Sequence, residues 1–212
     1  MIQIHLLIIR LQMMKDKFIN YYMRIAEETA NLSYAKRLKV GCIIVKDNRT
    51  ISIGYNGSAP GDCNDCEDKL KIDRSDSELI TKITEYMRSK YYTFTNHIFD
   101  FKIVPHIYHY GAIIDHVSIE PYYDKFNRID HDIYLLKTKS ETIHAEHNAI
   151  SKLSKSHESS EGASMFITHS PCMECCKNIL MSGIKEVYYK TDYRSLEGID
   201  YLISHGVVVN KI

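Results

Sequence analysis

The sequence predicts an α/β fold in which helices cover a sheet. Helical segments alternate with short apolar strands over residues 142–209, and two further strands are expected over 40–55. Apolar residues recur at spacings of three and four in the helical segments, whereas the strands are short runs rich in β-branched residues. This alternation is typical of layered α/β folds. A chain of 212 residues suits one such domain with a large insertion.

The first part of the pattern is a helix followed by a hairpin. A helix is expected over 15–32, because apolar side chains recur on one face. A continuous apolar run at 40–45 predicts a buried strand, and the turn residues 46–49 lead into an alternating partner strand at 50–55. The inward face of the helix is expected to hold Phe18, Tyr22, Ile25 and Ala26.

The last part of the pattern alternates regularly. Glycines follow two of its helices directly, as is common at helix C-termini. The helices are expected over 142–154, 172–181 and 195–204, and the strands over 163–168, 184–189 and 207–209.

The stretch between these two parts, at approximately 67–140, is interpreted as an insertion within a domain that runs from 14 to 212. It is rich in Tyr, Phe and His, which predicts a small aromatic core of its own, and helical spacing recurs over 76–91. Residues 1–13 are expected to be an apolar N-terminal extension. They are too few to span a bilayer, which takes about 20 residues, and they lack the pattern of a secretory signal.

Charge and cysteine content exclude some functions. The 27 basic residues equal the 27 acidic residues, so no global field attracts nucleic acid or an anionic membrane. Four of the six cysteines stand in Cys-x-x-Cys spacings, which favours metal binding in a reducing, cytoplasmic compartment over disulfides.

Two short motifs carry the chemistry: His144-Ala145-Glu146 and Pro171-Cys172-Met173-Glu174-Cys175. A catalytic zinc site uses three protein ligands and leaves one position for water, whose pKa falls to near 7. His144, Cys172 and Cys175 supply three ligands, and Glu146 remains for proton transfer. A lone histidine is usually structural, and Pro-Cys-x-x-Cys alone also fits a redox dithiol or half of a structural zinc site. Together the motifs match the signature of zinc nucleobase deaminases.

The helical periodicity places both motifs at helix N-termini that point into the core. Glu146 heads an apolar stripe in its helix, and a carboxylate there is expected to have a raised pKa that suits proton shuttling. The positive end of a helix dipole favours thiolates. The inward stripe of the second helix is expected to hold Cys172, Cys175, Cys176, Ile179 and Leu180, with Cys176 as a buried thiol.

Five segments resemble the deoxycytidylate (dCMP) deaminases of the zinc-dependent cytidine deaminase-like superfamily. The resemblance covers roughly 14–62 and 141–210, about two thirds of the chain. The segments that carry it are Arg37-Leu38-Lys39-Val40-Gly41-Cys42-Ile43-Ile44-Val45, Gly54-Tyr55-Asn56-Gly57, His144-Ala145-Glu146-His147-Asn148-Ala149-Ile150, Ser170-Pro171-Cys172-Met173-Glu174-Cys175 and Gly183-Ile184-Lys185-Glu186-Val187-Tyr188-Tyr189.

This resemblance implies a three-layer α/β/α fold with a central five-stranded mixed sheet, and a long insertion between the second strand and the zinc-ligand helix. It implies zinc on His144, Cys172 and Cys175, Glu146 as the proton shuttle, and hydrolysis of dCMP to dUMP and ammonia, with dUMP feeding thymidylate synthesis. It also implies a homo-hexamer with dCTP and dTTP as effectors.

Two substrate contacts are expected on the same grounds. Asn56 would contact the deoxyribose, the alternative being an ordinary turn asparagine. Lys155, just after the His144 helix, is a weak candidate for the 5′-phosphate, the alternative being a solvated lysine.

The chain departs from the family at a second zinc site. Some relatives place a structural-zinc cysteine near Ala35, which is not a cysteine here. Cys63 and Cys66 form their own Cys-x-x-Cys pair, and with an insertion histidine such as His131 they would supply ligands for a second zinc.

Two other functions remain open at this point. One is a deaminase of cytosine or adenine in RNA or DNA, such as a tRNA adenosine deaminase, which needs a basic, aromatic-lined groove. The mixed charge of the insertion argues against a nucleic-acid partner. The other is a zinc-stabilised interaction module without catalysis, in which Glu146 would have no role.

Overall fold

The computed structural model describes residues 14–71, 112–114, 117–123, 129–193 and 195–212. The chain divides into two compact units. The first comprises 1–35, 39–65 and 141–212, and the second comprises 36–38 and 66–140. The expected domain from 14 to 212, with an insertion at approximately 67–140 and an extension at 1–13, stays a prediction.

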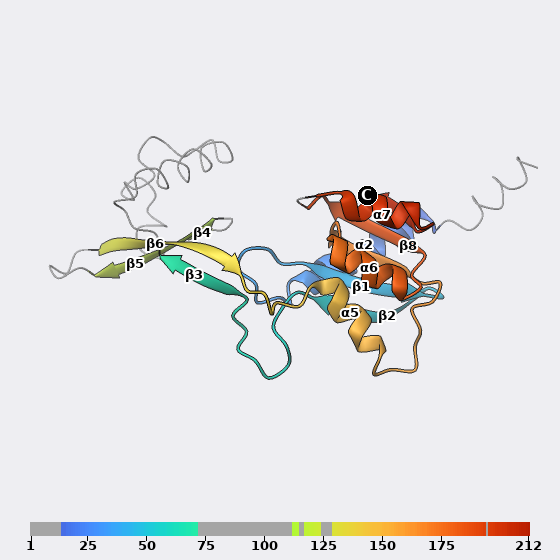
Figure 1. Ribbon diagram of the computed structural model, residues 1–212, viewed down its shortest axis with the longest axis horizontal. Coiled ribbons are helices and arrows are strands. Elements are labelled where there is room, and N and C mark those ends of the chain that lie inside the picture. Colours follow the sequence, from blue (N-terminus) through green and yellow to red (C-terminus); the bar gives the residue numbers. More distant parts are fainter. Residues whose placement is uncertain (1–13, 72–111, 115–116, 124–128, 194) are drawn as a thin grey trace, which may run out of the picture. The chain divides into compact units, whose positions relative to one another are not determined.

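The first unit is built on a mixed sheet, which has five strands in the described part of the chain. Its order is β2-β1-β7-β8-β9, with β1 antiparallel to both of its neighbours and β7, β8 and β9 parallel (Figure 1). The strands are β1 (Gly41–Lys46), β2 (Arg49–Tyr55), β7 (Ser164–His169), β8 (Glu186–Thr191) and β9 (Val208–Lys211).

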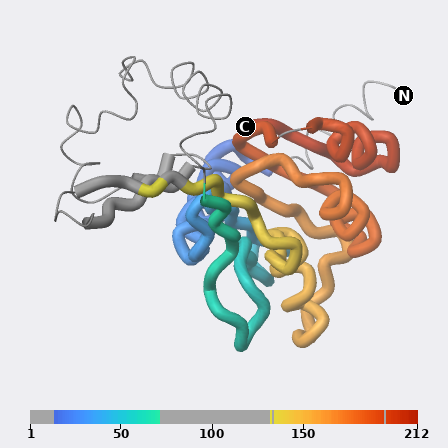
Figure 2. Tube along the Cα trace, turned by 60° about the vertical axis from the view of Figure 1, so that its left-hand side comes forward, coloured from blue at the N-terminus to red at the C-terminus, as the bar shows by residue number. Residues whose placement is uncertain are grey.

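Helices cover both faces of this sheet, and the order of the chain through them can be followed by colour in Figure 2. Helix α2 (Asp16–Ala30) packs on one face, where the rings of Phe166 and Tyr188 stack with centroids 4.7 Å apart. The other face carries α5 (Ala145–Leu153), α6 (Met173–Met181) and α7 (Glu197–Ser204). The predicted three-layer α/β/α arrangement with a central five-stranded mixed sheet is therefore confirmed.

The predicted inward face of α2 was partly wrong. Tyr22 and Ala26 are buried as expected, but Phe18 is 38% exposed and Ile25 is half-buried. The helix turns Ile19 and Met23 to the sheet instead. Ile19 and Met23 have the same i, i+4 spacing as Phe18 and Tyr22, and each lies one position further along the chain.

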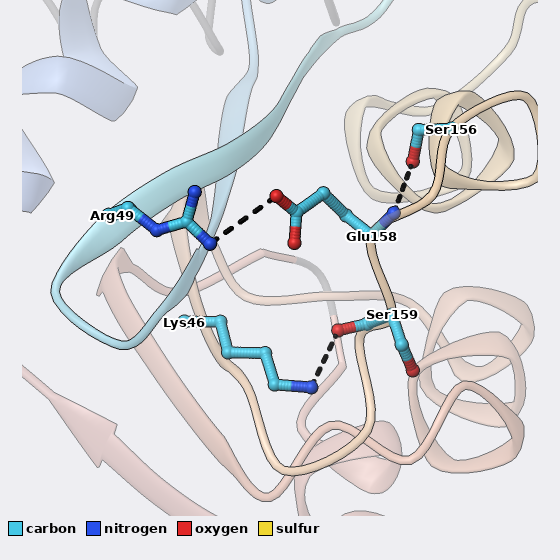
Figure 3. A network of polar contacts seen from close by, with 5 residues as sticks. All are labelled: Lys46, Arg49, Ser156, Glu158 and Ser159. Carbon is cyan, nitrogen blue, oxygen red and sulfur yellow. Dashed lines mark hydrogen bonds and ion pairs between the residues drawn. The ribbon is translucent and has the colours of Figure 1, made fainter.

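The β1–β2 hairpin is tight and is fastened at its tip. Asp47 and Asn48 adopt positive φ angles of 49° and 58°, which short polar residues tolerate in such turns. The Tyr22 hydroxyl donates to the Asn48 carbonyl at 2.8 Å. Figure 3 shows the loop after α5 bound to the hairpin, with Lys46 Nζ donating to the Ser159 carbonyl at 3.0 Å and Arg49 3.4 Å from Glu158.

The strand directions gather several loops at one edge of the sheet. Because β1 runs antiparallel to β2 and β7, its first residue lies at the edge where β2, β7 and β8 end. The loop after β2, the segment between β7 and α6, and the loop after β8 all begin there. In open α/β sheets this carboxyl edge is the usual place for a binding site.

The second unit contains a separate antiparallel sheet in the order β3-β6-β5-β4. Its strands are β3 (Glu67–Lys71), β4 (Ala112–Ile114), β5 (Val117–Tyr123) and β6 (Ile129–Thr138). The buried Glu67 carboxylate accepts hydrogen bonds from the backbone N–H groups of Lys36 and Arg37, both at 3.1 Å. These bonds attach the short segment 36–38 to the first strand of the inserted sheet.

Several expectations fall on residues outside the described ranges. These are the N-terminal extension at 1–13, the helix over 76–91 and most of the aromatic residues of the insertion. Among the helices that the structure does describe, none combines the length and the apolar character that crossing a membrane requires.

Candidate metal centre

The two motifs occupy equivalent places at the starts of two helices. His144 directly precedes α5 with φ −72° and ψ 153°, and Cys172 directly precedes α6 with φ −73° and ψ 167°. Both residues are extended, and neither side chain caps its helix. Each helix therefore begins immediately after a residue with a metal-ligating side chain.

The three predicted ligands come together in the structure. Each of His144, Cys172 and Cys175 offers one ligand atom, and these atoms all lie within 4.8 Å of one another. His144 Nδ1 lies 3.5 Å from Cys172 Sγ and 3.3 Å from Cys175 Sγ. Residues separated by some thirty positions in the sequence thus converge on one point at the N-termini of α5 and α6.

The thiols of Cys172 and Cys175 have pKa values that are shifted in opposite directions. The pKa of Cys172 is lowered to about 3, first because Cys175 donates a hydrogen bond to its thiolate and second because His144 does so. The pKa of Cys175 is raised because it keeps the proton of that bond and because it is buried. The pair therefore carries negative charge beside an imidazole, as a cation site requires.

Glu146 lies one residue into α5 and is only 4% exposed. Burial raises its pKa, while a backbone hydrogen bond, the charge of His144 and a hydrogen bond with Cys175 act in the opposite direction. The raised pKa agrees with the expectation from the sequence and suits proton transfer, and the catalytic role of Glu146 stays a prediction. The buried Cys42 thiol of β1 lies close enough for the charge of Glu146 to help burial raise its pKa.

The donor set suits zinc. One imidazole nitrogen and two sulfur atoms are ligands that Zn²⁺ prefers, and three protein ligands leave one position for water, as in catalytic rather than structural sites. Cys176, the third inward-facing thiol of α6, is fully buried outside this group and points to the Pro171 carbonyl at 3.6 Å. Burial raises the pKa of Cys176 to about 12.

The loop that contains Asn56 is fastened beside His144. Gly57 and Ile143 form a two-bond β-bridge, with N–O distances of 3.1 and 2.8 Å, and Ile143 directly precedes His144. The Asn56 side-chain oxygen accepts a hydrogen bond from Val40 N at 2.8 Å. The Ser33 hydroxyl donates to the Asn56 carbonyl at 2.7 Å.

The other predicted contacts do not join this cluster. Lys155 is exposed and follows the far end of α5, about 13 Å along the helix from its first turn. Cys63 is exposed and Cys66 is buried, and within the described residues they form no group of three ligands. The side chain of His131 lies outside what the structure describes, so the second zinc site stays a prediction.

Sequence reasoning missed the contacts that hold α5 against β2. A Cβ atom at Gly54 would lie 2.1 Å from the Ala145 carbonyl oxygen, so only glycine allows this approach. Ser52 Oγ donates to the Ala149 carbonyl at 2.7 Å, and Asn148 Nδ2 donates to the Tyr55 carbonyl at 2.8 Å. A glycine inside an alternating strand was the signal that could have revealed the contact.

Comparison with known proteins agrees with this geometry. Residues 16–191 match the family model described as the cytidine and deoxycytidylate deaminase zinc-binding region. The chain is 34% identical over 155 residues to the deoxycytidylate deaminase of Enterobacteria phage T4, covering 73% of this chain and 68% of that protein. It is 30% identical over 195 residues to ComE operon protein 2 of Bacillus subtilis, covering 91% and 69%.

A solved structure shows the same fold. The crystal structure of dCMP deaminase from the cyanophage S-TIM5 in complex with dCMP and dUMP aligns with a TM-score of 0.60 and 29% identity, over 94% of this chain and 100% of that one. Together with the family match over most of the sequence and the gathered His-Cys-Cys group, this likeness shows that the chain belongs to the cytidine and deoxycytidylate deaminase zinc-binding family.

Proposed function

We propose that this protein is a zinc-dependent dCMP deaminase that converts dCMP and water to dUMP and ammonia. The observation that carries the proposal is the convergence of His144, Cys172 and Cys175 with the buried Glu146 next to them. The relatives support the choice of substrate, because those from phages T4 and S-TIM5 are dCMP deaminases.

His144, Cys172 and Cys175 hold the zinc ion in this proposal. When bound, zinc lowers the pKa of a coordinated water molecule and so makes it nucleophilic at neutral pH. The negative charge on the thiol pair attracts the cation. Cys175 is buried, Cys172 is half-buried and His144 is exposed, so water and substrate can reach the position that the three ligands leave open.

Glu146 moves the protons. It takes a proton from the attacking water and delivers it to the ring nitrogen next to C4. It then takes the remaining proton from the hydroxyl group formed at C4 and delivers it to the leaving amine, so that C4 becomes a carbonyl carbon. The C4–N bond breaks as the new C4–O bond is retained, so dUMP and ammonia leave. Burial keeps the pKa of Glu146 above its usual range, which brings its proton affinity closer to that of the groups it serves.

Asn56 positions the sugar. Its side-chain oxygen is held by Val40 N, and its loop is attached to the residue before His144 by the Gly57–Ile143 bridge. The Asn56 side chain is therefore held on a loop that is hydrogen-bonded to the segment carrying the metal ligand His144. An amide held in this way discriminates a deoxyribose by hydrogen bonding without moving on substrate binding.

Further features follow from the family rather than from the site. We expect a homo-oligomer, a hexamer by resemblance, and regulation by dCTP and dTTP. We also expect a cytoplasmic enzyme whose dUMP supplies thymidylate synthesis. The inserted sheet of the second unit has no role assigned in this proposal.

A substrate panel tests the function. The zinc-loaded protein is incubated in parallel with dCMP, CMP, deoxycytidine and a tRNA, and ammonia release is followed. We expect turnover of dCMP to exceed that of the other three. Turnover of tRNA alone would favour a nucleic-acid deaminase, and zinc binding without any turnover would favour a non-catalytic zinc module.

A further inference from the structure

Gly198, in the first turn of α7, is buried against the segment that carries a metal ligand. A Cβ atom there would lie 2.7 Å from Cys176 Sγ, 3.0 Å from the Pro171 carbonyl oxygen and 3.3 Å from the Cys172 carbonyl carbon. Favourable non-bonded contacts lie at about 3.5–4.0 Å, so an added methyl group would overlap Cys176 Sγ by about 1 Å and the two other atoms by a few tenths of an ångström. Two of the three are backbone atoms, which cannot rotate aside.

Helix formation does not explain this glycine. Glycine within a helix costs about 1 kcal/mol relative to alanine. Gly198 is not among the glycines with a positive φ angle, so no left-handed conformation requires it. The close approach of α7 to the Pro171–Cys172 backbone is the remaining physical reason.

The backbone before Cys172 is held by hydrogen bonds to the end of β8 and to the segment that follows it. Ser170 N donates to the Thr191 carbonyl at 2.8 Å, and Tyr193 N donates to Ser170 Oγ at 2.8 Å. The Cys172 carbonyl accepts the first hydrogen bond of α6, from Cys176 N at 2.9 Å. The backbone of the ligand segment therefore has little freedom to absorb a displacement without moving Cys172 Sγ.

We propose that Gly198 is a positioning residue for the zinc ligand Cys172, and that the α7 contact determines the zinc affinity of the site. The inference rests on the assignment of Cys172 as a ligand in the proposed function. Metal–ligand distances tolerate deviations of only about 0.2 Å. A displacement of the Pro171–Cys172 backbone by a few tenths of an ångström already exceeds that tolerance, so the effect should appear in metal binding as well as in stability.

The test is the zinc affinity of Gly198→Ala, measured by competition with a chromophoric chelator in the absence of nucleotide. We expect binding weakened by about 10- to 100-fold, the usual effect of changes next to metal ligands. The thiolate-to-metal absorption of the Co²⁺-substituted protein should change as well. In Gly198→Ala/Cys176→Ala the contact with the sulfur atom is relieved but the two backbone contacts remain, so zinc affinity should stay below that of Cys176→Ala.

Leu202→Ala is the matched control, because Leu202 is fully buried in the same helix but belongs to the core and not to the ligand segment. It should lower thermal stability while the folded protein keeps its zinc affinity. Unchanged zinc binding in Gly198→Ala, equal weakening in Leu202→Ala, or the zinc affinity of Cys176→Ala in the double variant would each overturn the proposal. If the single variant does not fold, the double variant is compared with Cys176→Ala instead: weaker zinc binding supports the proposal, and equal zinc binding overturns it.

These outcomes are separate from those of the proposed function, because zinc affinity is measured without substrate. A protein that binds zinc as described but does not deaminate dCMP would contradict the function and leave the role of Gly198 supported.

Discussion

Cys172 and Cys175 have the same spacing as Cys63 and Cys66, but the two pairs lie in different surroundings. The first pair spans the start of α6 and meets His144, with the three ligand atoms within 4.8 Å. In the second pair, Cys63 is exposed in the loop after β2 and Cys66 is buried directly before β3. No helix begins at the second pair, and in the described part of the chain it gathers no third ligand.

The difference teaches that cysteine pairs of equal spacing can occur in different local structures. A helix start turns the side chains at i and i+3 to one side and favours thiolates through its dipole. A second helix start then has to bring an imidazole to the same point. The first pair meets both conditions, and the predictions below test the contrast between the two pairs, beginning with the largest expected effect.

Removal of the buried second cysteine of each pair should have opposite results. Cys175→Ala leaves two ligands and should abolish zinc binding and dCMP deamination. Cys66→Ala, at a thiol that is equally buried, should keep one zinc per chain and full activity. Bound zinc is measured by atomic absorption and activity by ammonia release. Loss of zinc from Cys66→Ala would instead establish a second site at the loop pair.

Glu146→Gln should separate zinc binding from turnover. The amide keeps the shape of the side chain but cannot carry protons, so kcat should fall by about 10²- to 10⁴-fold while zinc content stays at the wild-type value. The pair of measurements is zinc per chain and the initial rate of dUMP formation.

Glu174→Gln is the control for this experiment, because Glu174 lies between the two cysteines of the Pro-Cys-x-x-Cys motif but its side chain is 79% exposed and pairs with Lys177. Exposed ion pairs contribute about 0–1 kcal/mol, so activity should be unchanged. Full turnover in Glu146→Gln would contradict the proton-transfer role.

Asn56→Asp should lower kcat/KM for dCMP by about tenfold, which corresponds to the loss of one hydrogen bond of about 1.4 kcal/mol. The aspartate keeps an oxygen to accept the Val40 N–H bond, so thermal stability should change little. Asn56→Ala, by contrast, leaves that N–H without its acceptor and should also destabilise the protein. A normal kcat/KM in Asn56→Asp would show that the residue serves only the turn.

Periodicity was sufficient to predict most elements of the first unit. The strands from β1 to β9 in its sheet and the helices from α2 to α7 lie within about three residues of the expected ranges, because each buries one regular face. Glu146 and Cys176 are buried as their helical positions predicted. The prediction that Phe18 faces inward was wrong because two overlapping sets of apolar residues in α2 have the same spacing. Only packing against the sheet determines which set is buried.

Contacts between distant segments could not be predicted in this way. The Gly57–Ile143 bridge and the approach of Gly198 to Pro171 depend on how neighbouring loops meet at the edge of the sheet, and no local periodicity encodes that. The inserted sheet is a similar case. Its strand β3 contains Glu67, Asp68, Lys69 and Lys71, so only the pairing with β6 reveals it as a strand.

Lys155→Ala is expected to have the smallest effect, with kcat/KM for dCMP within about twofold of wild type, the usual range for surface substitutions. Lys155 is exposed and follows the end of α5 opposite to Glu146. The comparison of dCMP with deoxycytidine makes the test specific, because only dCMP carries the 5′-phosphate. Lys185→Ala, at an exposed lysine just before β8, is the control. A fall in kcat/KM that affects dCMP but not deoxycytidine, and occurs only in Lys155→Ala, would establish Lys155 as a phosphate contact and show that the substrate extends along α5.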